Sequence, residues 1–448
     1  MNNRRQFLKR SMGVSVFVVM PLSSCSKSEN TDFEIKVEYK TESWLDSKVD
    51  TFSYSMPEIE LIQNKKTRIK VTNNLNEPTT IHWHGIRLEN KMDGVSGLIQ
   101  APIEPGESFI YEFSAPDAGT FWFHSHHDSI KQVAMGLYGA LIVKPEKSLN
   151  NSEQDLTLLI DDWLLNENGI DPNFTAMHSL SHGGIMGNVL TVNKQPGLQA
   201  FQIEDKQYLR LRLINVANSR IQSWSFSGLN PIVIAKDGQP LKDQYTLNKS
   251  LVLGPAERYD LLVKVKEIPE DGFKLNYDTA NGALPIAEFI LPKVKTDFKN
   301  EAYNIEKSVL VVPKKIDKTV VVELDGGAMG RMQTGILDGE KLSINQLVQK
   351  NMIWALNGQV ALLATPMDKL ELNAAVNITF KNNTSFAHNM HLHGHHFFID
   401  GIWQDSVLIG RGESKSGVFY ADNPGKWLLH CHMLGHAVTG MTTWFEIG

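Results

Sequence analysis

Four non-overlapping histidine pairs of the form His-x-His are the residues of this sequence whose types and spacing could do chemistry. The pairs are His82/His84, His124/His126, His391/His393 and His430/His432. In a β-strand, residues i and i+2 point to the same face and lie about 6.6 Å apart along the chain. Two imidazoles held in this way can each bind a different ion of one metal cluster. Neutral imidazole suits copper, zinc and iron, and eight such ligands exceed what one ion accepts, so the pattern predicts several neighbouring ions.

Composition does not explain these pairs. The chain has 15 histidines among 448 residues, from which about half a His-x-His pair is expected by chance. No histidine stands between His182 and His388. A single pair is best interpreted as surface or core residues, whereas four pairs in two groups favour a metal centre.

Cys431 predicts a second kind of site. His388 lies upstream of it, and His436 and Met441 follow it, each after four intervening residues. One thiolate, two imidazoles and a weak thioether form the ligand set of blue-copper electron-transfer sites. Because strand faces alternate, Cys431 points away from the histidines on either side of it. Its sulfur could bind one copper while both neighbours reach the cluster, which gives electrons a short covalent path.

The histidine motifs belong to an internal repeat. Residues 119–126 match residues 425–432 at an offset of 306, and residues 82–85 match residues 391–394 at an offset of 309. The first and last parts of the chain are therefore predicted to be copies of one domain.

The two copies differ at the blue-copper positions. Where the second copy has the thiolate and two imidazoles, the first has Thr79, Ser125 and Ile130, although its Met135 matches Met441. Hydroxyl and alkyl side chains do not supply that ligand set. One electron-entry site and one multinuclear cluster are therefore expected.

Short β-rich runs between Pro, Gly and Asn must position these residues. Period-two alternation is typical of half-buried antiparallel strands in sandwiches or barrels, and it occurs at residues 67–72, 108–113, 208–214 and 375–380. Helical patterns are few and short. Breaks near residues 144–147 and 292–304 predict an all-β protein with domains at 33–147, 148–297 and 298–448. The middle domain has none of the pairs, and we expect the same fold there, with an unrelated fold as the alternative.

Residues 1–25 have the features of an export signal. Arg4-Arg5 precedes Phe-Leu-Lys and a short apolar stretch, which resembles a twin-arginine signal. Leu22-Ser-Ser-Cys25 resembles a lipoprotein cleavage box, so we expect a lipidated Cys25 followed by a tether at 26–32. These features predict export in the folded state by the twin-arginine machinery to the periplasm or cell envelope, with a membrane anchor. An ordinary signal peptide is the alternative.

Composition excludes several other classes of protein. Hydrophobic residues make up 42% of the chain and charged residues 21%, as in ordinary globular proteins. The formal charge is −6 although residues 1–25 hold four basic residues and no acidic one, so the acidic body argues against a nucleic-acid partner. Two cysteines form no disulfide framework, and no apolar run reaches the ~18 residues of a membrane span.

Together these motifs resemble the three-domain multicopper oxidases of the laccase and bacterial copper-efflux-oxidase kind. The similarity covers nearly everything after the signal and rests on residues 82–85, 118–126, 388–394 and 427–432 with His436 and Met441, and more weakly on residues 210–215, 254–258 and 354–358. The resemblance implies three tandem cupredoxin-like Greek-key β-sandwich or barrel domains and four copper ions. It also implies an oxidase that couples one-electron oxidation of a substrate to the four-electron reduction of O2 to water.

The resemblance assigns a role to each ligand by its position. His82 and His391 would bind the type 2 copper, and the type 1 copper would be bound by His388, Cys431 and His436 with Met441 as axial ligand. The type 3 pair would be bound by two groups, His84, His124 and His432 at one ion and His126, His393 and His430 at the other.

Two further roles concern protons and electrons. Cys431 would transfer electrons, and Asp93 would relay protons beside the type 2 copper, with a turn residue as the alternative for Asp93. Many bacterial relatives have a glutamate directly after the last type 1 histidine, where this chain has Ala437. The second proton donor is therefore unassigned.

The sequence leaves the substrate open between Cu(I) and phenolic or aromatic donors. Soft side chains that could bind Cu(I) stand at Met177, His178, His182, Met186, Met329 and Met332. A loop is the favoured interpretation of residues 177–186. Cuprous oxidases carry an aspartate and a methionine where this chain has Thr384 and Phe386, which weakens the Cu(I) hypothesis.

Two alternatives to an oxidase compete with this interpretation. A copper nitrite reductase needs only one mononuclear copper besides the type 1 site, so eight paired histidines disfavour it. The other alternative is a copper-buffering or cell-division protein that keeps the cupredoxin fold without oxidase turnover. Missing ligands would mark such a protein, and none is missing from this sequence.

Overall fold

The computed structural model describes residues 31–44, 47–150, 152–292, 296, 298, 302–361 and 364–448. The predicted signal at 1–25 and most of the predicted tether lie outside the described residues. The described chain forms three successive β domains, which we call the first, middle and third domains.

The first domain consists of two four-stranded sheets with the strand orders β2-β1-β4-β6 and β3-β8-β7-β5. Their strands are β1 (Phe33–Trp44), β2 (Ser47–Tyr54), β3 (Glu58–Ile62), β4 (Thr67–Asn73), β5 (Ile81–His84), β6 (Ser108–Phe113), β7 (Gly119–Ser125) and β8 (Tyr138–Lys144). In β4 every second residue is buried, as its alternating sequence predicts.

The middle domain has a seven-stranded sheet, β13-β12-β9-β15-β20-β17-β18, a five-stranded sheet, β14-β22-β21-β16-β19, and the hairpin β10-β11. Its strands are β9 (Glu153–Trp163), β10 (Leu165–Asn166), β11 (Gly169–Ile170), β12 (Val189–Val192), β13 (Gln195–Pro196), β14 (Gln199–Gln202), β15 (Tyr208–Asn215), β16 (Gln222–Ser227), β17 (Ile232–Lys236), β18 (Gln239–Thr246), β19 (Leu251–Leu253), β20 (Arg258–Lys264), β21 (Phe273–Thr279) and β22 (Gly282–Ile290).

The third domain has a six-stranded sheet, β26-β23-β28-β33-β30-β31, a five-stranded sheet, β27-β35-β34-β29-β32, and the hairpin β24-β25. Its strands are β23 (Lys318–Gly326), β24 (Thr334–Leu337), β25 (Glu340–Ser343), β26 (Trp354–Leu356), β27 (Asp368–Leu370), β28 (Ala375–Asn382), β29 (His388–Leu392), β30 (Phe397–Ile399), β31 (Ile402–Gln404), β32 (Ser406–Ile409), β33 (Ser414–Tyr420), β34 (Gly425–Cys431) and β35 (Thr442–Ile447).

The helices are short, as predicted. They are η1 (Asn90–Met92), α1 (Ser129–Ala134), α2 (Met177–Ser181), η2 (Val265–Glu267), α3 (Ile344–Gln349) and α4 (Leu434–Val438). No helix in the described part of the chain has the length and apolarity needed to cross a bilayer.

The three domains share one pattern of strand pairing. A parallel pair opens each domain, namely β1 with β4, β9 with β15 and β23 with β28. The second strand of each pair continues antiparallel into β6, β20 and β33, respectively. The all-β prediction with a similar fold in the middle domain is therefore confirmed, whereas the exact boundaries at 147/148 and 297/298 stay a prediction.

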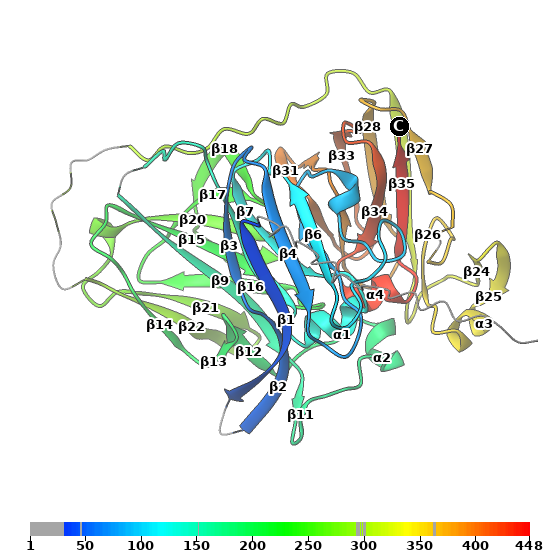
Figure 1. Ribbon diagram of the computed structural model, residues 1–448, viewed down its shortest axis with the longest axis horizontal. Helices are drawn as coiled ribbons and strands as arrows, with labels where there is room; N and C mark the ends of the chain where they lie inside the picture. Colours follow the sequence, from blue (N-terminus) through cyan, green and yellow to red (C-terminus); the bar gives the residue numbers. More distant parts are fainter. Residues whose placement is uncertain are drawn as a thin grey trace, which may run out of the picture.

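The domains pack closely enough to share a core. In Figure 1 the middle domain (green) and the third domain (orange to red) lie on either side of the first-domain strands (blue and cyan). One cluster of buried apolar side chains takes Trp122 from the first domain, Trp163 from the middle domain and Trp427 from the third. Helices α1 and α2 both contact α4, and in Figure 1 α1 and α4 lie near the lower ends of β6 and β34.

Two strand pairs carry the histidine pairs in matching registers. In the first domain His82 on β5 lies opposite His124 on β7, and in the third domain His391 on β29 lies opposite His430 on β34. The repeat seen in the sequence is thus a repeat in space, with the same strands presenting the same residue types.

Candidate metal centres

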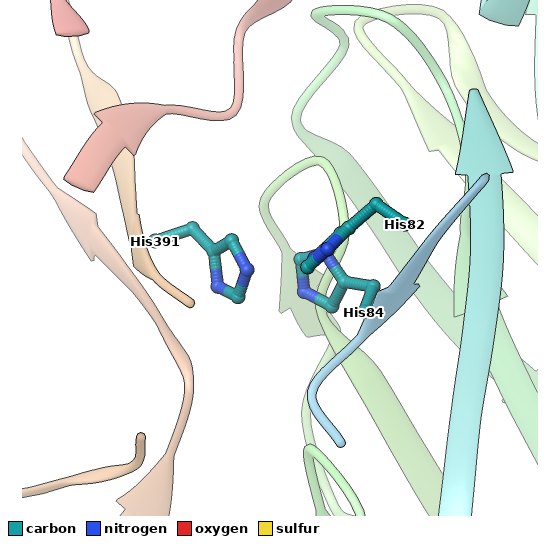
Figure 2. Close-up of side chains that lie close together, drawn as sticks. All are labelled: His82, His84 and His391. Carbon is teal, nitrogen blue, oxygen red and sulfur yellow. The ribbon is translucent and has the colours of Figure 1, made fainter. Parts of the chain in front are cut away.

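Eight paired histidines from the first and third domains converge on one buried region. The stacked rings of His82 and His393 have centroids 3.8 Å apart, and so do those of His84 and His391. The ring centroids of His84 and His432 are 5.0 Å apart, although the two residues are 348 positions apart in the sequence. Figure 2 shows His391 pointing from the third domain toward the rings of His82 and His84.

Each predicted ligand group is brought together by these strands. Potential ligand atoms lie within 4.8 Å of one another in three groups that match the sequence assignments, His84/His124/His432, His126/His393/His430 and His388/Cys431/His436. The two predicted type 2 ligands, His82 and His391, lie in a further group that also includes His84. A fifth group joins Asp93 to His82 and His393. His126 is half-buried, and the other members of these groups are buried.

Backbone carbonyls determine which ring nitrogen is protonated in three of the paired histidines. Nδ1 of His82 donates to the carbonyl oxygen of Asp93 (2.9 Å), and Nδ1 of His391 donates to that of Asp405 (2.8 Å). Nδ1 of His430 donates in the same way to the carbonyl of Cys431 (2.9 Å). Because a carbonyl only accepts, the neutral rings keep a lone pair on Nε2, the arrangement usual for metal-bound histidines.

Burial keeps the imidazoles of His84, His391 and His430 neutral. Desolvation, and then the neighbouring imidazoles, lower the pKa of His84 and His391 well below the usual range. Burial also lowers the pKa of His430 to about 4. Neutral imidazole is the form that binds a metal ion.

The arrangement fits a metal cation such as copper, because the lone pairs of these imidazoles face one another. Nδ1 of His393 donates to the Asp93 carboxylate (2.8 Å), which leaves Nε2 unprotonated and 3.2 Å from the equally unprotonated Nε2 of His430. In the described chain, Nε2 of His82, Nε2 of His391 and Nδ1 of His84 are buried without a hydrogen-bond partner. Buried nitrogens without partners are costly, and a cation among them removes that cost.

The predicted blue-copper residues form a separate buried group. Nδ1 of His388 lies 3.0 Å from Nδ1 of His436, and Sγ of Cys431 lies 3.7 Å from each. Nε2 of His388 donates to the Thr384 hydroxyl (2.8 Å) and Nε2 of His436 donates to a backbone carbonyl, so both Nδ1 atoms carry lone pairs.

Cys431 also needs a cation. Burial raises the pKa of its thiol to about 12, so the thiolate forms only when a metal ion compensates its charge. Met441 is fully buried beside this group. Its carbonyl accepts from the amide of Cys431 (3.1 Å) and its amide donates to the carbonyl of His436 (2.9 Å).

The matching pocket of the first domain has Thr79, Ser125 and Ile130 in place of the two imidazoles and the thiol. The hydroxyls of Thr79 and Ser125 both donate to Oε1 of Gln132, at 2.8 and 2.5 Å. The amide of Gln132 in turn donates to Glu77 and to the carbonyl of Pro78. Sequence reasoning missed Gln132, because it lies on α1 and has no counterpart among the blue-copper ligands.

Asp405 is a second residue that sequence reasoning missed. Its carboxylate lies 3.1 Å from Nε2 of His84, and its carbonyl holds His391. A signal was present, since Asp405-Ser-Val follows the pair His391/His393 as Asp93-Gly-Val follows its counterpart, His82/His84.

Three histidines outside the ligand groups have structural contacts. His395 lies with Nδ1 3.1 Å from the carbonyl of His393 and packs against Trp427. His396 lies 3.3 Å from the carbonyl of Asp237, and His127 bonds the Ser96 hydroxyl (3.0 Å).

A segment of the middle domain covers the type 1 candidate. The loop prediction is wrong for residues 177–181, which form α2, because the side chain of Leu180 is buried in the shared core. The carbonyl of His182 accepts from Nε2 of His436 (2.7 Å), and the ring of His182 packs on that of Phe386. The indole of Trp354 donates to the carbonyl of Leu180 (2.9 Å).

Comparison with known proteins identifies the family. Models of the multicopper oxidase family match residues 48–148, 122–285 and 338–448. The chain is 28% identical to the multicopper oxidase MmcO of Mycobacterium tuberculosis over 426 residues, which cover 84% of this chain and 78% of that protein. It is 29% identical to Laccase-2 of Fomitopsis schrenkii over 430 residues, with 82% and 78% covered.

Solved structures agree with these relatives. The multi-copper oxidase from Pseudomonas thermotolerans superposes with a TM-score of 0.79 at 26% identity, over 94% of this chain and 100% of that one. Lac15 from a marine microbial metagenome gives a TM-score of 0.73 at 30% identity, over 92% and 99%. The chain therefore belongs to the multicopper oxidase family.

Membership confirms the predictions of three cupredoxin domains and of an oxidoreductase that uses O2 and a reducing substrate. The histidine clusters are consistent with a type 1 site and a trinuclear copper site. The role of each ligand and the number of ions stay predictions.

Proposed function

We propose that this multicopper oxidase binds four copper ions through the ligands assigned above. His82 and His391 would bind the type 2 ion, and the two groups of three histidines would bind the type 3 pair. His388, Cys431 and His436, with Met441 axial, would bind the type 1 ion. The observation that carries the proposal is the 3.2 Å approach of two unprotonated nitrogens, Nε2 of His393 and of His430, since a cation between them relieves their repulsion.

Copper held by these residues would supply one-electron redox chemistry, which suits the reduction of O2 by four electrons and four protons to two waters. Cys431 links the two centres, because its sulfur belongs to the type 1 group and the residues on either side belong to the type 3 groups. Asp93 holds two cluster histidines, His82 through its carbonyl and His393 through its carboxylate. Its role as the proton relay stays a prediction.

A metal count tests this proposal. The protein loaded with copper is expected to hold about four ions per chain and to show the strong absorption of a blue-copper site. The matched variant Cys431→Ser should lose the blue absorption and keep the other three ions. A wild-type protein that binds no copper, or one ion only, would contradict the proposal.

We further propose Cu(I), rather than a phenol, as the substrate. This is supported by the bond from Nε2 of His436 to the carbonyl of His182, which leaves an organic donor no hydrogen bond to that ring edge. The amide of Ala328 donates to the carbonyl of Ser181 (2.7 Å), so α2 and the segment after β23 lie together there. Residues 177–186 and the segment after β23 carry the methionines and histidines that could bind Cu(I), namely Met177, His178, His182, Met186, Met329 and Met332. The side chain of Met329 is 75% exposed. Thioether and imidazole suit Cu(I).

The substrate proposal is tested by removing the thioethers together. A variant with leucine at Met177, Met186, Met329 and Met332 is expected to oxidise Cu(I) about tenfold more slowly, which corresponds to ~1.4 kcal/mol of lost binding, and to oxidise a phenol at the wild-type rate. Met56→Leu, which packs against the first-domain core, is the matched control. An equal loss with both substrates, or no loss, would reject Cu(I) as the favoured substrate.

We also propose export and lipid anchoring, on the basis of residues 1–25 alone. The expected location is the periplasm or cell envelope, reached through the twin-arginine machinery in the folded state. Replacing Arg4 and Arg5 by lysine should retain the protein inside the cell, and Cys25→Ala should release it from membranes. Membrane association that persists in Cys25→Ala would refute the anchor.

A further inference from the structure

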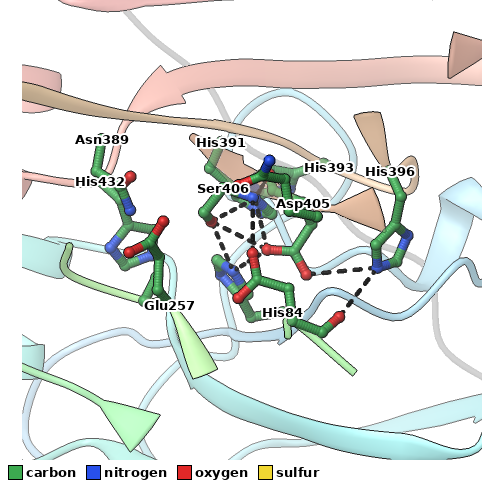
Figure 3. Close-up of polar contacts among 12 residues, drawn as sticks. His84, Glu257, Asn389, His391, His393, His396, Asp405, Ser406 and His432 are labelled. Carbon is green, nitrogen blue, oxygen red and sulfur yellow. Dashed lines mark hydrogen bonds and ion pairs between the residues drawn. The ribbon is translucent and has the colours of Figure 1, made fainter. Parts of the chain in front are cut away.

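We propose that Asp405 and Arg258 are positioning residues for the trinuclear cluster, so that the middle domain helps to shape a metal site to which it gives no ligand. The inference rests on the proposed function. Asp405 touches one candidate ligand from each copper-binding domain. Its carbonyl accepts from Nδ1 of His391 (2.8 Å), and its carboxylate accepts from Nε2 of His84 (3.1 Å). Figure 3 shows these contacts converging on Asp405 and the adjacent Ser406.

Asp405 is the counterpart of Asp93 in the internal repeat. Asp93 holds His82 of its own domain through its carbonyl and His393 of the third domain through its carboxylate. Asp405 likewise holds His391 of its own domain through its carbonyl and His84 of the first domain through its carboxylate. Each aspartate therefore fixes one type 2 ligand from its own domain and one type 3 ligand from the other domain. Two such reciprocal bonds set the spacing of the two ligand sets across the domain interface.

The two aspartates differ in their charge partner. The guanidinium of Arg258 binds both carboxylate oxygens of Asp405, at 2.8 Å to Oδ1 and 2.6 Å to Oδ2, with both side chains fully buried. Asp93 has no arginine or lysine partner among the described residues, and its Oδ1 accepts no hydrogen bond there. A bidentate pair holds a carboxylate in one orientation. Asp405 is thus fixed in position, whereas Asp93 keeps one free oxygen at the cluster.

Arg258 is itself held by the first and middle domains. Its Nε donates to the carbonyl of Thr120 (3.3 Å), its Nη1 donates to that of Ala256 (3.1 Å), and Asp237 lies 3.4 Å from Nη1. All three domains therefore meet at one ion pair beside His84.

Gly85 makes room for this ion pair. Its φ is +84°, and a Cβ there would lie 2.6 Å from Nη2 of Arg258 and closer still to Oδ2 of Asp405. A larger residue directly after His84 would push apart the arginine and the carboxylate that orients the same histidine. The geometry of residues 84–85 thus depends on groups from the other two domains.

The loss of the arginine should act on the cluster and spare the type 1 site. In Arg258→Met the Asp405 carboxylate loses its bidentate partner, so His84 loses a fixed acceptor. The type 1 group has separate anchors, Thr384 and the carbonyl of His182. Removing such a supporting contact typically lowers metal affinity by about 10–100-fold.

The experiment compares Arg258→Met with Arg210→Met. Arg210 is another buried middle-domain arginine, paired with Asp260, Glu306 and Tyr303 and with none of the histidine groups. Both variants and the wild type are loaded with copper and titrated with a chelator, and electron paramagnetic resonance and optical spectra are recorded. Arg258→Met is expected to lose cluster copper at a 10–100-fold lower chelator concentration with an altered type 2 signal and an unchanged blue band.

The outcomes separate this inference from the proposed function. A wild type without cluster copper refutes the proposed function itself. A wild type with cluster copper that Arg258→Met leaves unchanged, or that Arg210→Met weakens equally, refutes the positioning role alone. If Arg258→Met does not fold, Asp405→Asn replaces it. Asparagine has the size of aspartate, and the backbone carbonyl of residue 405 still accepts from His391, but the charged pair with Arg258 is lost. A wild-type type 2 signal and wild-type chelator resistance in folded Asp405→Asn would overturn the proposal.

Discussion

The first and third domains present the same strands and the same histidine pairs to the cluster, yet they differ on the opposite strand faces. In the third domain the Nδ1 atoms of His388 and His436 lie 3.0 Å apart, and the thiol of Cys431 lies 3.7 Å from each, so two lone pairs and a thiol face one another. In the first domain Thr79 and Ser125 both donate to Gln132, which closes the pocket by hydrogen bonds. The same strand arrangement therefore supports either a metal site or a pocket whose polar side chains hydrogen-bond one another, and a few side chains decide which. Hydrogen-bond satisfaction, more than the fold, distinguishes the two pockets.

The largest expected effect is the loss of the third-domain thiol. Cys431→Ser should remove the type 1 ion and lower oxidase turnover by more than about a thousandfold, as when an essential catalytic group is removed. Absorption spectra and O2 uptake measure both effects. The reciprocal variant Ser125→Cys should create no second blue band, because Thr79 and Ile130 stand where the imidazoles would be needed. A blue Cys431→Ser protein would contradict the assignment.

The two aspartates offer the next test. Asp93→Ala removes the acceptor of His393 and the free oxygen at the cluster, so turnover should fall about 10–100-fold while the blue band is kept. Steady-state O2 uptake and rapid reduction of the blue band separate the cluster from electron entry. Slow reduction of the blue band in this variant would place the defect at the type 1 site and count against the cluster role of Asp93.

Acid should destabilise the metal-free protein through its histidines. Burial lowers the pKa of His430 and of His436 to about 4, below the ordinary value of about 6.5. Between these values the unfolded chain binds protons that the native state does not, so stability falls as the pH drops. Each such histidine contributes about 1.4 kcal/mol per pH unit in that window. Thermal unfolding of chelator-treated protein from pH 7 to 4 measures the slope, and a flat profile would contradict neutral buried imidazoles.

The smallest expected effect concerns the axial position. Met441→Leu should raise the type 1 potential, because removing the weak axial donor disfavours Cu(II). Each tenfold change in the relative affinity for Cu(II) and Cu(I) corresponds to about 59 mV. Met135→Leu, at the matching position of the first domain, should leave the potential unchanged. A redox titration of the blue band decides, and an unchanged or lower potential in Met441→Leu would remove Met441 from the axial role.

The fold class and the convergence of the ligands could be predicted because both depend on short sequence patterns. Alternation predicts strands, and the His-x-His repeat places equivalent residues on equivalent strand faces. The grouping of His84 with His432 came from the resemblance to the multicopper oxidases, which assigns both residues to one type 3 ion.

The contacts that orient these ligands could not be predicted in the same way. The bond from His436 to the carbonyl of His182 depends on how the middle domain packs, and a backbone carbonyl leaves no mark in a sequence. Arg258 stood in a family-like stretch, but its partner Asp405 lies 147 residues away in another domain. Gln132 accepts hydrogen bonds from Thr79 and Ser125 only because α1 packs beside the segments that carry them, and the sequence does not show that packing.

Anomalous diffraction at the copper edge, from crystals of the copper-loaded protein, tests the central claim most directly. The account predicts three copper peaks among the eight paired histidines and a fourth between His388, Cys431 and His436. A single peak, or peaks away from these groups, would contradict it.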